Sequence, residues 1–192
     1  MSIKLEGNWK RGLAFDVHTL SSTYLGVNDF GYDQWENTRS EIGELLYQLK
    51  YRADPRKVRK IVMLLDKIKG IESMDHLIPV PSTNKHRRVQ PVVEIARALG
   101  ERRGVKVLES VLCKRAGGPE LKNVTDVDER ERLLRERLYL AECDAIAGRN
   151  VLLMDDLYRS GATLRVATEL LYKQGGVNDV FVLTMTKTRS TR

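Results

Sequence analysis

Cysteine and long apolar runs are both scarce in this sequence of 192 residues. The two cysteines, Cys113 and Cys143, form no Cys-x-x-Cys pair, which argues against a cysteine-based zinc site and favours reduced thiols. No apolar run approaches the roughly 20 residues that cross a bilayer, and residues 1–12 lack the apolar segment of a secretory signal. We therefore expect a cytoplasmic protein with no membrane partner.

Acidic residues are the minority among the charges, since 26 Asp and Glu face 33 Lys and Arg and leave a net charge of +7. The cations gather in three clusters, at 50–60, 85–88 and 97–106. A basic surface attracts polyanions, either nucleic acid or a phosphorylated metabolite. For 50–60 and 97–106 a solvated helix face is the simpler interpretation, so charge alone identifies no partner.

Apolar residues make up 42% of the chain, which is enough for a sizeable core. Short apolar runs predict buried strands at 75–81, 105–112, 149–156 and 179–188. Helical periodicity predicts helices at 38–52, 54–70, 90–104 and 163–176. Strands that alternate with helices indicate βαβ units and a parallel sheet. We expect residues 71–192 to form this core, and residues 1–70 to form an N-terminal extension with a helical hairpin.

The N-terminal extension gives weaker signals. Residues 13–27 alternate partially, which predicts a short hairpin or two strands, and residues 28–37 are rich in turn formers. Ser40 and Asp54 are expected to cap the two helices of the helical hairpin, and Gly70 to end the second.

Residues 151–163, VLLMDDLYRSGAT, run from an apolar stretch into two aspartates and then into a small, hydroxyl-bearing turn. Ligands of parallel sheets bind beyond the carboxyl ends of the strands, and the start of a helix favours an anion. The turn is therefore expected to bind a phosphate through Arg159, Ser160, Gly161, Ala162 and Thr163. Asp155 and Asp156 can accept hydrogen bonds from a sugar diol or hold Mg²⁺.

A phosphate beside a diol describes a ribose 5-phosphate. The simpler alternative for each part of the stretch is an Asp-containing turn with a Ser or Thr that caps the helix. The complete string resembles the phosphoribosyl-pyrophosphate (PRPP) signature of type I phosphoribosyltransferases. That resemblance implies that Asp155 and Asp156 hold the ribose hydroxyls, and that residues 159–163 hold the 5-phosphate. Arg159 departs from the signature, which usually has Thr or Ser there.

Two upstream stretches narrow the resemblance to the competence-protein ComF family: GELLYQLKYRAD at 43–54 and LIPVPSTNKHRRVQPVVEIARALG at 77–100. The resemblance implies pyrophosphate contacts in the loop after the strand, from Ser82, Lys85, Arg87 and Arg88. A solvated turn is the alternative. The chain departs from this family by lacking the zinc-ribbon cysteines, and by having RRVQP in place of an Arg-Gly-Phe-Asn-Gln stretch.

Residues 114–130 take the place of the flexible loop that covers PRPP in type I enzymes. Lys114, Arg115 and Lys122 could reach the pyrophosphate when such a loop closes. A loop followed by a surface helix is an equally good interpretation of this segment.

The resemblance implies an α/β, type I phosphoribosyltransferase fold, with a mostly parallel twisted sheet flanked by helices and an N-terminal α/β hood. It implies transfer of phosphoribosyl from PRPP, with Mg²⁺, to an unidentified acceptor. The alternative is a PRPP- or nucleotide-sensing module that acts with nucleic acid or a protein partner, in DNA uptake or phage defence. A phosphoesterase is a weaker alternative. The apolar stripe of the helix pair at 38–70 serves either a homodimer or the core of the monomer.

Overall fold

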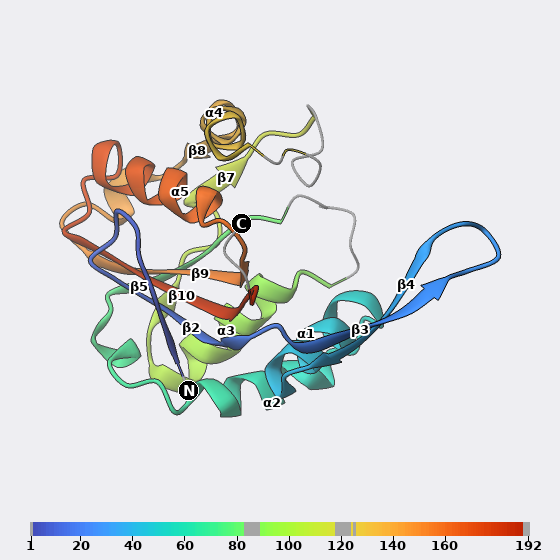
Figure 1. Ribbon diagram of the computed structural model, residues 1–192. Coiled ribbons are helices and arrows are strands. Elements are labelled where there is room, and N and C mark those ends of the chain that lie inside the picture. Colours follow the sequence, from blue (N-terminus) through green and yellow to red (C-terminus); the bar gives the residue numbers. More distant parts are fainter. Residues whose placement is uncertain (1, 83–88, 118–123, 125, 190–192) are drawn as a thin grey trace.

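The structure is a computed structural model that describes residues 2–82, 89–117, 124 and 126–189 (Figure 1). Six described strands form the central sheet in the order β1-β2-β10-β9-β5-β6. Their bounds are Ile3–Leu5 (β1), Arg11–Val17 (β2), His76–Pro79 (β5), Lys106–Val107 (β6), Asn150–Tyr158 (β9) and Asp179–Lys187 (β10). Every neighbouring pair is parallel except β1 with β2. The predicted α/β class with a mostly parallel sheet is confirmed.

Helices cover both faces of this sheet, as Figure 1 shows. Helices α1 (Glu41–Tyr51), α2 (Arg56–Leu65) and α3 (Pro91–Arg103) lie on one face, and α4 (Val127–Arg137) and α5 (Ala162–Lys173) lie on the other. Successive residues of a strand point to opposite faces. Accordingly Val151 and Leu153 of β9 pack with α5, whereas Leu152 and Met154 pack with α1 and α3.

Two small ribbons stand apart from the sheet. Strand β7 (Leu112–Lys114) pairs with β8 (Leu138–Leu140), and β3 (Thr19–Val27) pairs with β4 (Asp33–Arg39). The β3–β4 hairpin projects away from the body of the protein (Figure 1). Short 3₁₀ helices occupy Ile71–Ser73 and Cys143–Ala145. No helix among the described residues is long and apolar enough to cross a membrane.

Local signals fix several element boundaries where the sequence places them. The Ser40 side chain caps α1, since its Oγ accepts a hydrogen bond from the Gly43 backbone N–H at 3.1 Å. Asp54 Oδ1 accepts one from the Arg56 N–H at 3.1 Å, but the N-cap of α2 is Pro55, one residue later than predicted. Helix α2 ends at Leu65, however, and not at Gly70. The Arg103 guanidinium reaches across from α3 to the Asp66 and Ile68 carbonyls, at 2.9 and 3.2 Å, and so holds this segment outside a helix.

Two strand predictions need correction. Only residues 28–32 of the turn-rich segment at 28–37 form a turn. Residues 33–37 belong to strand β4, where Trp35 pairs across the hairpin with Tyr24 and the two ring centroids lie 5.0 Å apart. The predicted strand at 105–112 is broken into β6 and β7. Between them Glu109 binds Arg97 of α3, with 2.5 Å between Oε1 and Nε, which turns the chain out of the sheet.

Candidate functional site

The site lies where the connections of the sheet diverge. Strands β5 and β9 are parallel neighbours, but β5 leads to α3 on one face and β9 leads to α5 on the other. Such a switch point leaves a crevice beyond the carboxyl ends of the two strands. A cavity of about 260 Å³ occupies it. The lining residues come from α1, the end of β5, the start of α3, β7, β9 and the start of α5.

Asp155 and Asp156 both line this cavity, but they belong to different faces of β9. Asp156 points toward the α1 face, where Lys50 Nζ lies 2.5 Å from its Oδ2. Asp155 shares its face with Val151 and Leu153, on the side of β7 and Lys114. Adjacent acids are tolerable here because the strand separates their side chains and a lysine stands on each side.

Burial raises the pKa of the Asp155 carboxyl to about 7, and the neighbouring charge of Asp156 adds to the effect. The Asp156 N–H, which donates to Asp155 Oδ1 at 2.8 Å, and the charges of Lys50 and Lys114 oppose it. Lys114 is itself buried, at 8% exposure. Burial lowers its pKa and the charge of Arg137 lowers it further, whereas Asp155 favours its charged form. The cavity therefore pairs carboxylates with ammonium groups in surroundings that screen charge poorly.

The sequence predicted that this strand would end at Asp156, but it does not. It continues to Tyr158, because Leu157 and Tyr158 remain paired with Thr186 and Lys187 of β10. The acids are consequently held by the sheet itself and not by a turn, which fixes their direction.

The predicted phosphate turn connects this strand to α5. Gly161 caps the helix with φ 77°, and a Cβ at this position would lie 2.7 Å from the Tyr158 ring. Only glycine fits such a backbone beside such a ring. Ser160 Oγ accepts a hydrogen bond from the Ala162 N–H at 3.5 Å, and Thr163 lines the cavity. The first N–H groups of a helix have no acceptor within it, which makes the start of α5 a candidate anion site.

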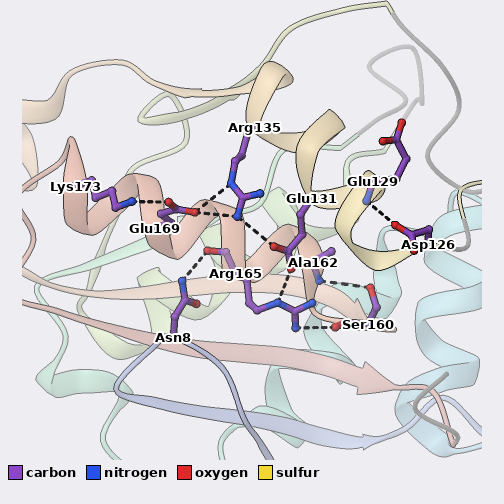
Figure 2. Close-up of polar contacts among 10 residues, drawn as sticks. All are labelled: Asn8, Asp126, Glu129, Glu131, Arg135, Ser160, Ala162, Arg165, Glu169 and Lys173. Carbon is purple, nitrogen blue, oxygen red and sulfur yellow. Dashed lines mark hydrogen bonds and ion pairs between the residues drawn. The ribbon is translucent and has the colours of Figure 1, made fainter.

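A network of ion pairs between α4 and α5 holds the turn at 159–163 in place (Figure 2). Arg165 of α5 donates through Nη1 to the Ser160 carbonyl at 2.9 Å, and its Nε lies 2.6 Å from Glu131 Oε1 of α4. Glu131 also pairs with Arg135, which bridges to Glu169 of α5 at 3.2 Å. Through Arg165 the turn is linked to α4, whose first residues belong to the segment at 114–130 that was predicted to cover the ligand.

The structure brings part of the predicted residue set together. Five predicted residues line the cavity: Ser82, Lys114, Asp155, Asp156 and Thr163. Ser160, Gly161 and Ala162 form the adjoining turn. Lys85, Arg87, Arg88 and Lys122 lie outside the described residues.

Three cations differ from expectation. Arg159 is exposed and does not line the cavity. Its charge is felt by Arg130 of α4, whose pKa is lowered first by burial and then by Arg159. Lys114 belongs to strand β7 and not to a loop. Arg115 is exposed, with its guanidinium 5.6 Å from the centre of the Tyr139 ring, and it does not line the cavity either.

Sequence reasoning missed Lys50 and His18. Lys50 falls in the cluster at 50–60, which was interpreted as a solvated helix face, yet it is half-buried against Asp156. The signal was its spacing: Lys50 continues the i, i+4 stripe of buried Ile42 and Leu46 into the core. His18 offered no local signal.

His18 is linked to the backbone carbonyl of Asp156 through a side chain of β10. Its Nδ1 lies 3.3 Å from Thr186 Oγ1, and that hydroxyl donates to the Asp156 carbonyl at 2.9 Å. Burial lowers the pKa of His18, and the charges of Lys50 and Arg39 lower it further. A neutral imidazole that donates from Nδ1 therefore fits this chain of hydrogen bonds.

No protein-family model matches the sequence, and no curated protein matches it. Solved structures resemble it in fold. The allosteric regulatory enzyme of purine biosynthesis is 20% identical over 83% of this chain, with a TM-score of 0.48. Glutamine PRPP amidotransferase from B. subtilis is 19% identical over 83%, with a TM-score of 0.49. This chain spans about a third of each, 34% and 35%. Adenine phosphoribosyltransferase from Thermoanaerobacter pseudethanolicus is 18% identical over 84% of this chain and 93% of its own, with a TM-score of 0.46.

Proposed function

We propose that the cavity between β5 and β9 binds PRPP, and that the protein transfers its phosphoribosyl group to an acceptor. One observation carries the proposal: β9 presents two carboxylates at the switch point of the sheet, directly before a glycine turn and the start of α5. Diol acceptors and an anion site are thereby placed in adjacent positions, in the order that a ribose 5-phosphate requires.

The parts of the ligand would be divided among three regions of the cavity. The 5-phosphate would occupy the turn at 159–163, and the ribose hydroxyls would donate to Asp155 and Asp156. The pyrophosphate would extend toward Ser82 and Lys114, where the end of β5 and strand β7 meet the cavity. A buried lysine suits this place, because a multiply charged leaving group needs cations that water does not screen.

In the transfer, an acceptor lone pair would form a bond to ribose C1 while the bond from C1 to the pyrophosphate oxygen breaks. Pyrophosphate would leave with that electron pair, and C1 would be inverted. Positive charge would develop on the sugar, and Asp155 and Asp156 would stabilise it by lying beside the ring. Because burial raises the pKa of Asp155 to about 7, its full negative charge would require a pH above that value or a bound cation.

The acids fit a role for Mg²⁺, which binds through one or two carboxylates and takes its other ligands from water and substrate phosphates. Among the described residues no group of three His, Cys, Asp or Glu side chains gathers as a self-sufficient metal site. Asp155 and Asp156 would therefore hold a metal that arrives with the ligand. When bound, Mg²⁺ would neutralise the charge of the pyrophosphate. Lys50 already supplies a cation to Asp156.

Calorimetric titration of the full chain with PRPP and MgCl₂ tests the proposal. We expect saturable binding that weakens by at least about 100-fold when Asp155→Asn and Asp156→Asn are combined, since two ionic hydrogen-bond acceptors are lost. Asp144→Asn is the matched control, because Asp144 is exposed and lies outside the cavity lining. Absence of binding to the parent protein, or equal binding by the double variant, would refute the proposal.

The alternative is a module that senses PRPP or a nucleotide and acts with nucleic acid or a partner protein. The outward position of Arg159 favours it, because this cation faces solvent near Arg130 of α4 and not the cavity. Release of pyrophosphate separates the two functions. A sensing module binds PRPP without releasing pyrophosphate with any nucleobase or amine, and its binding to DNA or RNA weakens steeply with salt.

Membership of the ComF-like branch and a cytoplasmic location are finer parts of the same proposal. The unpaired thiols of Cys113 and Cys143 are in keeping with a reducing compartment. The stretches at 43–54 and 77–100 supply the ComF-like resemblance, and the first of them contains Lys50.

A further inference from the structure

The β3–β4 hairpin carries most of the exposed apolar side chains of the described residues. Seven of the ten large hydrophobic residues that are exposed belong to it: Leu20, Tyr24, Leu25, Val27, Phe30, Tyr32 and Trp35. Phe30 at the tip is 84% exposed. A two-stranded ribbon that projects alone is marginally stable in water, and a large exposed apolar surface marks an interaction site. In Figure 1 the hairpin projects from the described body of the protein, and these apolar side chains remain exposed there.

One face of the hairpin combines aromatic and acidic side chains. Tyr24 pairs directly with Trp35, and Val27 pairs with Asp33, so that each pair shares a face of the ribbon. The Tyr24 hydroxyl donates to Asp33 Oδ1 at 3.0 Å, which places the acid beside the rings.

The hairpin is acidic although the protein is basic. Residues 19–38 contain Asp29, Asp33 and Glu36 but no Lys or Arg, in a chain with a net charge of +7. Acidic side chains repel phosphates, which disfavours nucleic acid as the partner of this surface. A basic surface with an apolar centre is the complementary partner.

The outer face of α2 has that character. Arg56, Arg59, Lys60 and Met63 are exposed, and their spacing of three, four and seven residues places them on one side of the helix. Met63, which is 57% exposed, lies one turn beyond Arg59 and Lys60 on the same side of the helix. Arg56 is paired with Asp54, whereas Arg59 and Lys60 form no ion pair with another described residue.

We propose that the β3–β4 hairpin docks on the α2 face of a second copy of this chain. Each copy would give one hairpin and receive one, so that the same contact is made twice about a two-fold axis. Tyr24 and Trp35 would pack on Met63, and Asp29 and Asp33 would approach Arg59 and Lys60. Aromatic residues and Met in the centre with charges at the rim are the usual composition of an interface. The inference is independent of the proposed PRPP site.

Sedimentation of the purified full chain over a series of concentrations tests the association. We expect a monomer–dimer equilibrium whose dissociation constant rises about tenfold or more between low salt and roughly 0.5 M salt, because exposed charges are screened there. A protein that stays monomeric at every concentration would overturn the proposal. The hairpin would then have to bind a different partner.

Charge reversal tests the two surfaces against each other. Asp29→Lys with Asp33→Lys should raise the dimer dissociation constant at least about tenfold, and Arg59→Glu with Lys60→Glu should do the same. An equimolar mixture of the two reversed proteins should dimerise although neither does so alone, because the basic hairpin of one meets the acidic α2 of the other and the acidic hairpin of the second meets the basic α2 of the first. All four substitutions in one chain should likewise recover the parent value within about threefold. Glu101→Lys, an exposed position on α3, is the control and should have no effect.

Other results contradict the proposal in distinct ways. A dimer lost on reversal of the hairpin but kept on reversal of α2 would mean that hairpins contact each other. A dimer indifferent to the hairpin variants would place the contact elsewhere. Circular dichroism of each variant establishes that it is folded, and Trp35→Ser supplies a second hairpin variant without a change of charge, expected to weaken the dimer.

Discussion

The end of β9 and the β3–β4 hairpin invert the usual distribution of side chains in opposite ways. At the end of β9 the charges of Asp155, Asp156 and Lys114 lie inside the protein, around a cavity. On the hairpin, Phe30 and Trp35 lie in water. Buried charge and exposed aromatic surface both cost free energy in the isolated chain.

The two regions differ in what supports them. The acids of β9 are held by strands on both sides, by helices on both faces and by the charges of Lys50 and Lys114. Within the part of the chain that the structure describes, the hairpin contacts α1 through β4 and otherwise projects from the body of the protein. A rigid surround suits a site that must hold a small ligand in one geometry, whereas an unsupported arm suits a surface that is completed by another chain.

The largest expected difference between the regions is in stability. Leu153→Ala removes a fully buried side chain of β9 and should lower the free energy of unfolding by about 3 kcal/mol. Phe30→Ser should change it by less than about 0.5 kcal/mol, because Phe30 is exposed. Urea unfolding at low protein concentration, where the proposed dimer is absent, measures both. A loss above about 1 kcal/mol for Phe30→Ser would show that the hairpin is packed on its own chain.

A second effect, of similar size, concerns pH. Since burial raises the pKa of Asp155 to about 7, the folded protein holds a proton there that the unfolded chain releases above about 3.8. Folding stability from this group is thus greatest at low pH and falls as pH rises from about 4 to about 7, by at most about 1.4 kcal/mol per pH unit. Asp155→Asn should remove that fall while Asp144→Asn keeps it. Unfolding at several pH values decides, and identical pH profiles for parent and Asp155→Asn would contradict the expectation.

The features that the sequence predicted correctly depend on interactions between residues close together in the chain. The buried run of β9, the cap at Ser40 and the helix after Gly161 were all predicted, because each depends on residues within a few positions. The end of β9 and the start of α5 meet Ser82 in one cavity because β5 and β9 are parallel neighbours in the sheet. These signals are local or topological, and a single sequence contains them.

What was missed depends on partners far apart in the chain. Lys50 meets Asp156 across 106 positions, so its cluster seemed to be a solvated face. The break between β6 and β7 depends on Arg97, and the early end of α2 depends on Arg103. Periodicity contains no information on such contacts.

A smaller effect separates backbone strain from close packing in the turn before α5. Gly161 and Gly148 both have positive φ, 77° and 68°, but only Gly161 has atoms in the place of a Cβ. Gly148→Ala should cost about 1 kcal/mol of stability for the left-handed backbone, and Gly161→Ala about 1 kcal/mol more because it collides with Tyr158. Thermal unfolding compares the two. Equal losses would mean that the ring moves aside and that the turn is less tightly fixed than the contact indicates.

The smallest expected effect is the coupling between Lys50 and Asp156. The pair is partly buried, with side-chain exposures of 21% and 17%, so it should contribute more than a surface ion pair and less than a fully buried one. Lys50→Met and Asp156→Asn, alone and together, form a double-mutant cycle in which we expect a coupling of about 1 kcal/mol in unfolding free energy. Lys4 with Glu6, an exposed pair with side-chain exposures of 74% and 80%, is the control and should give less. If Lys50 supports Asp156 as a ligand acceptor and not only as a structural pair, Lys50→Met should also weaken PRPP binding at low Mg²⁺ and recover as Mg²⁺ rises. If high Mg²⁺ restores PRPP binding of Lys50→Met but not its stability, Lys50 acts by supplying positive charge to the site. If Lys50→Met loses neither PRPP binding nor stability, the contact between Lys50 and Asp156 has no functional effect.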